Sequence, residues 1–309
     1  MDTGTVQNAM PLETYRREAW LQKRMSSVGS SDSPAIVGLS RWKTPLHIYL
    51  EKTGELQPQR PNQAQKSGLL LENVVAAMYE EQTGNVVQMP DCPHYTSPTK
   101  SFMAATLDRT TKVDGEWGIL ELKTARTAEG WGVEGSEDIP PDYYCQVQHQ
   151  MYVTGYRFAM VAALIAGQDL KVYRIRYDDD YAHRLMVAID YFWNMVQTKN
   201  PPPFDWEHPA TPDLVRRSQK IVAGKVVQDD SKELHDLCRA YCHVKDMAKS
   251  IDEEKGDIHW KLLLKVGEAE TVTTSSGYVV KRRKITRKAY HAEESQYINL
   301  TVKEPKNGE

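Results

Sequence analysis

The sequence contains few cysteines and no long apolar run. Its four cysteines are irregularly spaced along 309 residues, which excludes a disulfide-rich scaffold and favours a reducing cytoplasm. No stretch approaches the roughly 18 consecutive apolar residues of a membrane-spanning helix. The first residues, MDTGTVQNAM, lack the basic and apolar pattern of a secretion signal. We therefore expect a cytoplasmic protein with no membrane partner.

The sequence also lacks an excess of positive charge. Its 39 Lys and Arg residues stand against 42 Asp and Glu residues, and the formal net charge is −3. A nucleic-acid partner would therefore need a local basic surface. Hydrophobic residues make up 40% of the chain and charged residues 26%, as in an ordinary globular protein with one or two domains.

Hydrophobic periodicity predicts a mixed α/β core over residues 1–206. The predicted helices cover 11–27, 44–54, 68–84, 142–155 and 181–199, and buried strands are predicted at 158–167 and 170–179. The proline-rich stretch NPPPFDW at 200–206 predicts a break in the chain. Beyond it, residues 207–309 are expected to form a C-terminal extension with a charged helix over 229–266 and a hairpin around a Ser-Ser-Gly turn.

A β-hairpin with a polar face is predicted over residues 105–125. An Asp-Gly pair in the middle of this segment is a strong signal for a two-residue turn. In the register that this turn sets, Asp108 lies opposite Glu121, and Thr106 lies opposite Lys123. Because side chains alternate along a strand, Glu121 and Lys123 share one face, and leucines occupy the other.

The two facing carboxylates of this hairpin favour a metal site. Like charges directly opposite each other destabilise a sheet, and a divalent cation would offset that repulsion. Mg²⁺ and Mn²⁺ bind through a few carboxylates plus water. Lys123 beside such an ion could orient a water molecule or stabilise charge on a phosphate. For the hairpin taken alone, the alternative is a solvated strand face in a different register.

The pattern Asp-x(n)-Glu-x-Lys resembles the core of PD-(D/E)xK nucleases, with Leu107 in the place of the proline. Three flanking blocks are similar, in the same order, to the YqaJ-like viral recombinase family, which includes the lambda-type phage exonucleases. They are SSVGSSDSPAIVGLSRWKTPLHIYLEKTG, GLLLENVVAAMYEEQTG and IPPDYYCQVQHQMYVTG. The resemblance covers roughly residues 15–180. It implies a restriction-endonuclease-like fold for residues 1–206, with a mixed central sheet flanked by helices.

The resemblance also implies roles for individual residues of the predicted metal site. Asp108 and Glu121 would be metal ligands, together with the backbone carbonyl of Leu122. Glu72, on the preceding helix, would complete the metal shell, and Lys123 would be the catalytic lysine. The implied cofactor is Mg²⁺, with Mn²⁺ as a substitute, at one or two ions per active site.

Further positions resemble those that hold DNA in the family. Arg24, Ser31 and Thr106 would bind a terminal 5′ phosphate, which suits an arginine fork and a helix N-terminus. Gln146 and Gln148 lie about 200° apart on one helix, so only one of them can enter the site. The resemblance does not decide between them, and we favour Gln148 as the catalytic residue.

Two features are predicted to contact DNA outside the metal site. Trp42, next to Arg41, could wedge or stack at a duplex end, although a core position is equally compatible with the sequence. Near the C-terminus, a basic run is expected either to track phosphates as a ribbon or to protect an exposed strand edge. It includes Arg282, Arg283 and Lys284.

The implied function is a Mg²⁺-dependent 5′–3′ exonuclease that degrades linear double-stranded DNA and leaves 3′ tails for phage-type recombination. Implied with it are a single-strand annealing partner, a homotrimer, and a phage or prophage origin. The alternatives are another PD-(D/E)xK nuclease, either an endonuclease or a RecB/Cas4-like exonuclease, and a non-catalytic DNA-binding recombination scaffold. The irregular cysteine spacing argues against the iron–sulfur cluster of Cas4-like proteins, and the intact Asp108, Glu121 and Lys123 argue against a scaffold.

Overall fold

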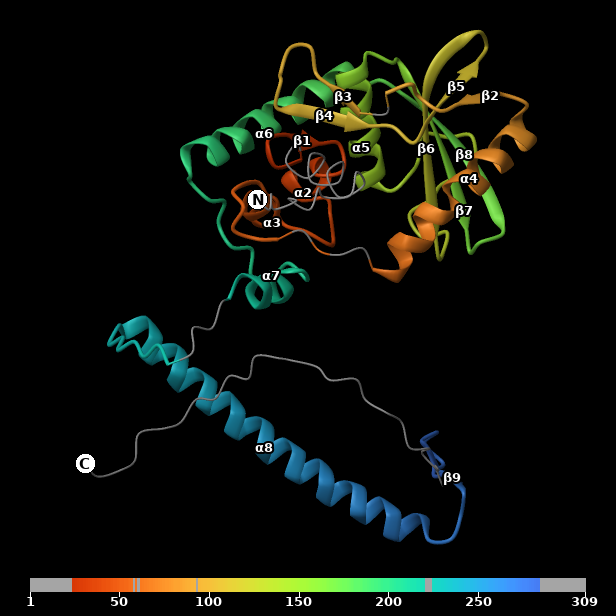
Figure 1. Ribbon diagram of the computed structural model, residues 1–309. Coiled ribbons are helices and arrows are strands. Elements are labelled where there is room, and N and C mark those ends of the chain that lie inside the picture. Colours follow the sequence, from red (N-terminus) through yellow and green to blue (C-terminus); the bar gives the residue numbers. More distant parts are fainter. Residues whose placement is uncertain (1–23, 58, 60–61, 93, 220–223, 284–309) are drawn as a thin grey trace, which may run out of the picture. The chain divides into compact units, whose positions relative to one another are not determined.

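The computed structural model describes residues 24–57, 59, 62–92, 94–219 and 224–283 (Figure 1). Most of the helix predicted over 11–27 lies outside these residues. The chain forms two compact units, residues 1–220 and 221–309, which are described separately. The division falls after residue 220, later than the predicted 206, because helix α7 (Thr211–Ser218) packs on the first unit. Its Leu214 is buried there, and Asp213 accepts a hydrogen bond from Gln59 at 2.9 Å.

A five-stranded mixed sheet forms the centre of the first unit (Figure 1). Its strand order is β2-β5-β6-β7-β8, and every neighbouring pair is antiparallel except β6 and β7, which are parallel. The predicted mixed central sheet is therefore confirmed. The strands are β2 (Val86–Gln88), β5 (Arg109–Val113), β6 (Glu116–Ala125), β7 (Phe158–Ile165) and β8 (Asp169–Arg176).

Helices cover both faces of this sheet. Helix α4 (Gln63–Thr83) packs its Val75 and Tyr79 against the face that carries Leu120 and Leu122. Helix α5 (Pro141–Thr154) covers the other face, because two parallel neighbours such as β6 and β7 need a crossover connection. Alternation along β6 therefore turns its leucines towards α4 and its polar residues towards α5.

The ends of α4 follow from local chemistry. The Asn62 side chain caps the helix by accepting a hydrogen bond from the backbone amide of Gln65 at 2.9 Å, and Gln65 Oε1 accepts one from the backbone amide of Asn62 at 2.9 Å. This capping box starts the helix five residues before the predicted Gly68. At the other end Gly84 adopts the left-handed conformation, with φ of 69°, and closes the helix where predicted.

A second, three-stranded sheet had no counterpart in the prediction, because its strands are too short to show periodicity. Its order is β1-β4-β3, and β1 is parallel to β4. The helices around it share one apolar core with it. The strands are β1 (Val28–Gly29), β3 (His94–Thr96) and β4 (Met103–Thr106), and the helices are α2 (Ser33–Ile36), α3 (Pro45–Lys52) and α6 (Asp179–Thr198).

The second unit consists of a long helix and a hairpin, as predicted. Helix α8 (Lys232–Val266) begins at Ser231, whose hydroxyl accepts a hydrogen bond from the Leu234 amide. Strands β9 (Thr271–Thr273) and β10 (Val279–Lys281) form an antiparallel hairpin. In the described ranges of both units, no helix is long and apolar enough to cross a membrane.

Candidate active site

The β5–β6 hairpin has the predicted register, but it is shorter than predicted. Val113 pairs with Glu116, and the same register continues to Arg109 opposite Leu120, where β5 ends. Thr106 does not face Lys123, because it belongs to β4 and pairs with His94 in the other sheet. The chain passes between the two sheets at residues 107–108, and Asp108 lies at this bend.

Asp108 lies at the bend between the sheets and points at the middle of β6. Its Oδ2 accepts a hydrogen bond from the amide of Leu122 at 2.9 Å. Burial and the negative charge of Glu121 raise the pKa of Asp108 to about 7, against the opposing effects of Lys123 and of that hydrogen bond. The two carboxylates are therefore close enough to repel each other, as the hairpin pattern predicted.

Glu121 lies beneath α5 with only 2% of its surface exposed. Its Oε1 accepts hydrogen bonds from Lys123 Nζ at 2.6 Å and from Gln146 Nε2 at 2.7 Å. Its Oε2 accepts one from Gln150 Nε2 at 2.8 Å. Three side-chain donors thus hold one buried carboxylate in a single orientation, so the predicted polar face is an enclosed site and not a solvated strand.

Lys123 is charged and fixed in this site. Its Nζ also donates to Gln146 Oε1 at 3.0 Å and lies 4.7 Å from the ring centre of Tyr143. Burial opposes charging of the lysine, but the Glu121 and Asp108 carboxylates outweigh it and raise the pKa of the ammonium. A positive charge is therefore held beside the carboxylate pair.

Gln146, and not the favoured Gln148, enters the site. Gln148 is fully buried on the opposite side of α5, where its Nε2 donates to the carbonyl of Arg176 at 2.7 Å and its Oε1 accepts from the amide of Asp178 at 3.0 Å. These bonds tie α5 to the end of β8. Gln148 is therefore a structural residue, and our preference for it is corrected.

Gln150 was missed by the sequence analysis. Its Nε2 donates to the carbonyl of Thr106 at 3.2 Å as well as to Glu121, so it links the end of β4 to the site. Its buried Oε1 has no hydrogen-bond partner in the described part of the chain. The sequence spacing could have predicted this role, because Gln150 follows Gln146 by four residues and therefore lies on the same face of the helix.

Glu72 is half-buried on α4, and its pKa depends on the charges of Glu121 and Lys123. Burial raises its pKa, the Glu121 carboxylate adds to the effect, and Arg109 and Lys123 oppose it. Arg109 is buried at the start of β5 and donates to Asn73 of α4 at 2.6 Å. The pairing of Arg109 with Asn73 therefore keeps this turn of α4, and Glu72 with it, near the bend that carries Asp108.

The oxygen donors of Asp108 and Glu121 suit a hard cation that takes only a few of its ligands from the protein. In the described residues, no group of three or more His, Cys, Asp or Glu side chains is placed to hold a metal ion. Mg²⁺, however, needs only one or two carboxylates, with water and substrate phosphates as its other ligands. Asp108 and Glu121 meet that need, and their mutual repulsion is what a cation would relieve. The predicted roles of Asp108, Glu121, Glu72 and the Leu122 carbonyl as metal ligands all stay predictions.

A second polar cluster surrounds Asp32. This residue is buried and directly precedes the first residue of α2. Arg24 donates to Asp32 Oδ1 at 2.9 Å, and Lys52 donates to Oδ2 at 2.6 Å. Burial alone would raise the pKa of Asp32, but the two cations lower it below its ordinary value. With two cations and one anion, the cluster keeps a net positive charge.

Ser31 and Thr106 lie at one edge of the smaller sheet. Gly29 of β1 pairs with Ala104 of β4 in parallel, so the residues that follow the two strands emerge at the same end. Ser31 and Thr106 each come two residues after this pair, and both are exposed. The structure thus brings two of the three predicted phosphate-binding residues to the edge next to Asp108, while Arg24 joins the cluster around Asp32.

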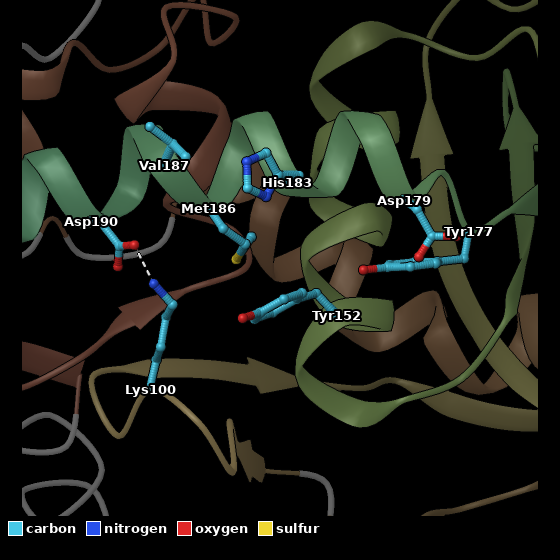
Figure 2. Close-up of a pocket in the computed structure, with 8 residues that line it drawn as sticks. All are labelled: Lys100, Tyr152, Tyr177, Asp179, His183, Met186, Val187 and Asp190. Carbon is cyan, nitrogen blue, oxygen red and sulfur yellow. Dashed lines mark hydrogen bonds and ion pairs between the residues drawn. The ribbon is translucent and has the colours of Figure 1, made fainter.

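A cavity of about 380 Å³ lies along α6, away from these residues (Figure 2). The side chains of Tyr152 and His183 line it, and an ion pair between Lys100 and Asp190 bridges its wall. None of the predicted site residues lines it. The candidate active site is therefore the carboxylate pair under α5 and not this cavity.

Comparison with known proteins decides the family. The YqaJ-like viral recombinase domain matches residues 19–157. A protein of Bacillus subtilis, the uncharacterized protein YqaJ, is 30% identical over 260 residues, which are 82% of this chain and 79% of that protein. The chain belongs to the YqaJ-like viral recombinase family. The matched domain contains both carboxylates, Lys123 and both glutamines of the site, and the family indicates a phage-type nuclease.

Solved structures with exonuclease names are also similar to this YqaJ-like chain. An alkaline exonuclease, LHK-Exo, from Laribacter hongkongensis is 18% identical, with a TM-score of 0.44, over 59% of this chain and 93% of that one. The same exonuclease in complex with dAMP has a TM-score of 0.46 at the same identity and coverage. A putative exonuclease from Eubacterium rectale is 10% identical, with a TM-score of 0.43, over 75% of this chain and 98% of that one.

The remaining predicted DNA contacts of this YqaJ-like protein lie outside the carboxylate site. Trp42 is 69% exposed, so it is not a core residue, and the guanidinium of Arg41 lies 4.7 Å from its ring centre. Arg282 and Arg283 follow β10 and are exposed, although Arg282 Nε donates to the carbonyl of Ala269 at 2.9 Å. Lys284 lies outside the described residues.

Proposed function

We propose that this protein is a Mg²⁺-dependent exonuclease that degrades linear double-stranded DNA from the 5′ end and leaves 3′ single-stranded tails for phage-type recombination. The observation that carries the proposal is the pair of the half-buried Asp108 and the buried Glu121, with Lys123 at 2.6 Å from Glu121. Repelling carboxylates beside a fixed ammonium suit phosphodiester hydrolysis better than they suit stability.

Each residue of the site has a separate task in this proposal. Mg²⁺, or Mn²⁺ in its place, would offset the charge of the scissile phosphate and activate water for attack on phosphorus. Asp108 and Glu121 would hold the cation, with the Leu122 carbonyl and Glu72 as further ligands. Lys123 would stabilise the negative charge that develops on the phosphate oxygens.

The two glutamines of α5 would keep the site ready for the substrate. Gln146 contacts both Glu121 and Lys123, so its position governs the distance between the anion and the cation. Gln150 fixes the second oxygen of Glu121. A carboxylate held by three donors loses little freedom when it binds a metal ion, which favours catalysis by preorganisation.

The 5′ to 3′ direction of degradation would come from a pocket that binds the terminal 5′ phosphate. The charge of the Arg24, Asp32 and Lys52 cluster is positive overall, and the backbone amide of Gly29, at the end of β1, donates to Asp32 at 3.1 Å. Ser31 and Thr106 at the same sheet edge offer hydroxyl groups to phosphate oxygens. We further propose a single-strand annealing protein as partner and a trimer of this chain around DNA, both supported by the family alone.

The test is a digest of linear duplex DNA that carries a 5′ phosphate and a label at either the 5′ or the 3′ terminus. Early release of the 5′ label, with Mg²⁺ and not with EDTA, is expected. Nicked and closed circular DNA are incubated alongside. Cleavage of closed circles would indicate an endonuclease instead, and absence of any Mg²⁺-dependent nucleotide release would leave only the DNA-binding scaffold.

Substitutions of the two central residues connect the activity to this site. Glu121→Ala and Lys123→Ala should each remove most of the activity, because loss of a metal ligand or of the charged lysine costs on the order of several kcal/mol of transition-state stabilisation. Circular dichroism and gel filtration check that the purified variants are folded. Near-normal turnover by either folded variant would show that the active site lies elsewhere.

A further inference from the structure

Helix α8, with 35 residues, carries a seam that is apolar at eight of its ten positions. Within the described second unit nothing covers this seam: its seven large apolar members are between 41% and 62% exposed. Long helices gain most of their stability by burying an apolar face, so the seam needs a partner. Including Ala248 and two lysines, its ten positions are Leu234, Leu237, Tyr241, Val244, Ala248, Ile251, Lys255, Ile258, Leu262 and Lys265.

The spacing of the seam is that of a coiled coil. Successive positions are alternately three and four residues apart from Leu234 to Lys265, which is the heptad repeat that keeps two helices in contact. The seam therefore extends along about 47 Å of helix at 1.5 Å per residue. A surface of this length and regularity suits another helix of equal length and no shorter segment.

We propose that α8 pairs with α8 of a second copy of this chain in an antiparallel coiled coil. In the register centred between residues 248 and 251, Ala248 lies opposite Ile251 of the second copy. Leu237 then lies opposite Leu262, and Tyr241 lies opposite Ile258. Each of the ten seam positions finds a seam position across the interface, because the sum of the two residue numbers is constant.

The two seam lysines favour this orientation over the parallel one. In a parallel pair each seam residue meets its own copy, so Lys255 would face Lys255 and Lys265 would face Lys265 inside an apolar interface. In the antiparallel pair Lys255 lies opposite Val244, and Lys265 lies opposite Leu234 near the end of the helices. The ammonium groups are then separated, and their long stems can reach water.

Charges that flank the seam give a second, independent argument. Lys245 and Asp252 both follow the seam on the same side. In the antiparallel register Lys245 of one copy lies beside Asp252 of the other, and the twofold symmetry repeats the pair. In a parallel dimer Lys245 would lie beside Ala240, and Asp252 beside Met247. The pair of Lys245 and Asp252 therefore forms only in the antiparallel arrangement, and its source is a second copy of this helix.

The mass of the full-length protein in solution, from light scattering, tests the pairing. Ile251→Glu places a charge at the centre of the seam and should halve the mass of the assembly, from two chains to one or, where the chain forms the proposed trimer, from two trimers to one. Trp260→Glu is the matched control, because Trp260 is 64% exposed on the side of α8 away from the seam, and it should keep the mass. An unchanged mass for Ile251→Glu would overturn the proposal, since the seam would then be covered by this chain itself or by a different protein.

A charge exchange tests the orientation without entering the seam. Lys245→Glu should weaken self-association about tenfold, because it replaces two ion pairs by two repulsions. Adding Asp252→Lys in the same chain should restore the original dissociation constant, because each new glutamate then meets a new lysine. Failure of the double variant to recover, with Lys245→Glu weakened, would exclude this register, since in a parallel pair the two positions never meet.

Discussion

Replacing Asp108 with Asn should abolish activity and yet stabilise the metal-free protein above pH 7. Above pH 7 the Asp108 carboxylate of the folded protein is ionised and is repelled by the neighbouring Glu121. Asparagine removes one of the charges. Its side-chain oxygen can still accept the hydrogen bond from the Leu122 amide, which Asp108 accepts at 2.9 Å.

The size of the effect follows from the pKa of Asp108. Burial, together with Glu121, raises this pKa from 3.8 to about 7. At about 1.4 kcal/mol for each pH unit, ionisation at pH 8 costs the folded state at most on the order of 4 kcal/mol, and about 2 kcal/mol once the side chains relax. Between pH 4 and pH 7 the folded state binds the proton more tightly than the unfolded chain does. The wild type therefore recovers stability as the pH falls, and the advantage of Asn disappears towards pH 4.

Urea unfolding in EDTA at pH 8, 6 and 4.5 measures this difference. The matched control is Asp114→Asn, in the exposed turn of the same hairpin, which should change the free energy of unfolding little at any of these values. Added Mg²⁺ should raise the Tm of the wild type but not that of Asp108→Asn. A variant less stable than the wild type at pH 8 in EDTA would refute the reasoning, because it would mean that the ionised carboxylate is a favourable part of the fold.

Three other results are expected. Gln146→Ala should lower kcat by about 10- to 100-fold with the fold intact. Gln148→Ala should instead cost about 1–3 kcal/mol of stability, because it empties a fully buried position and removes the partner of the Arg176 carbonyl and the Asp178 amide. Equal effects of the two variants on kcat per folded molecule would contradict this assignment. If the phosphate pocket exists, linear duplex with a 5′ phosphate should be degraded faster than duplex with a 5′ hydroxyl. Arg24→Ala should reduce this difference in rate. Equal rates on the two substrates for the unmutated protein would remove the support for the pocket. The basic run after β10 can be tested with a variant in which alanine replaces Arg282, Arg283 and Lys284. If the run tracks phosphates, each phosphate neutralised contributes about −0.9 to the slope of log binding constant against log salt concentration, so the variant should bind duplex more weakly and with a flatter salt dependence. An unchanged slope would leave protection of a strand edge as its role.

The hairpin at the centre of the site could be predicted from sequence because its register depends on local chemistry. The Asp-Gly turn sets which residues face each other, and the turn and the strands contain all the information needed. Where β5 begins depends instead on a distant partner. Thr106 leaves the hairpin because His94 and Gly29 belong to strands that pair with its own strand, and no periodicity in residues 105–125 reveals such a competitor.

The choice between the glutamines failed for a related reason. Helix geometry established that Gln146 and Gln148 point in different directions, but the face that meets β6 depends on how α5 docks. The pair at positions 146 and 150 held that information, because two amides on one face of a helix can both reach a single carboxylate. Similarly, the position of Trp42 could not be decided, since an aromatic residue in a loop has the same sequence signature when buried and when exposed.

The parallel pairing of β6 with β7 has a consequence for the biosynthesis of this protein. Glu121 obtains its amide donors only when α5 has crossed the sheet, and α5 is anchored only when β7 has paired with β6. A nascent chain that stops before Phe158 has no strand to close this crossover, so its carboxylates are not yet held together. The proposed nuclease activity can therefore appear only after both central strands have been translated.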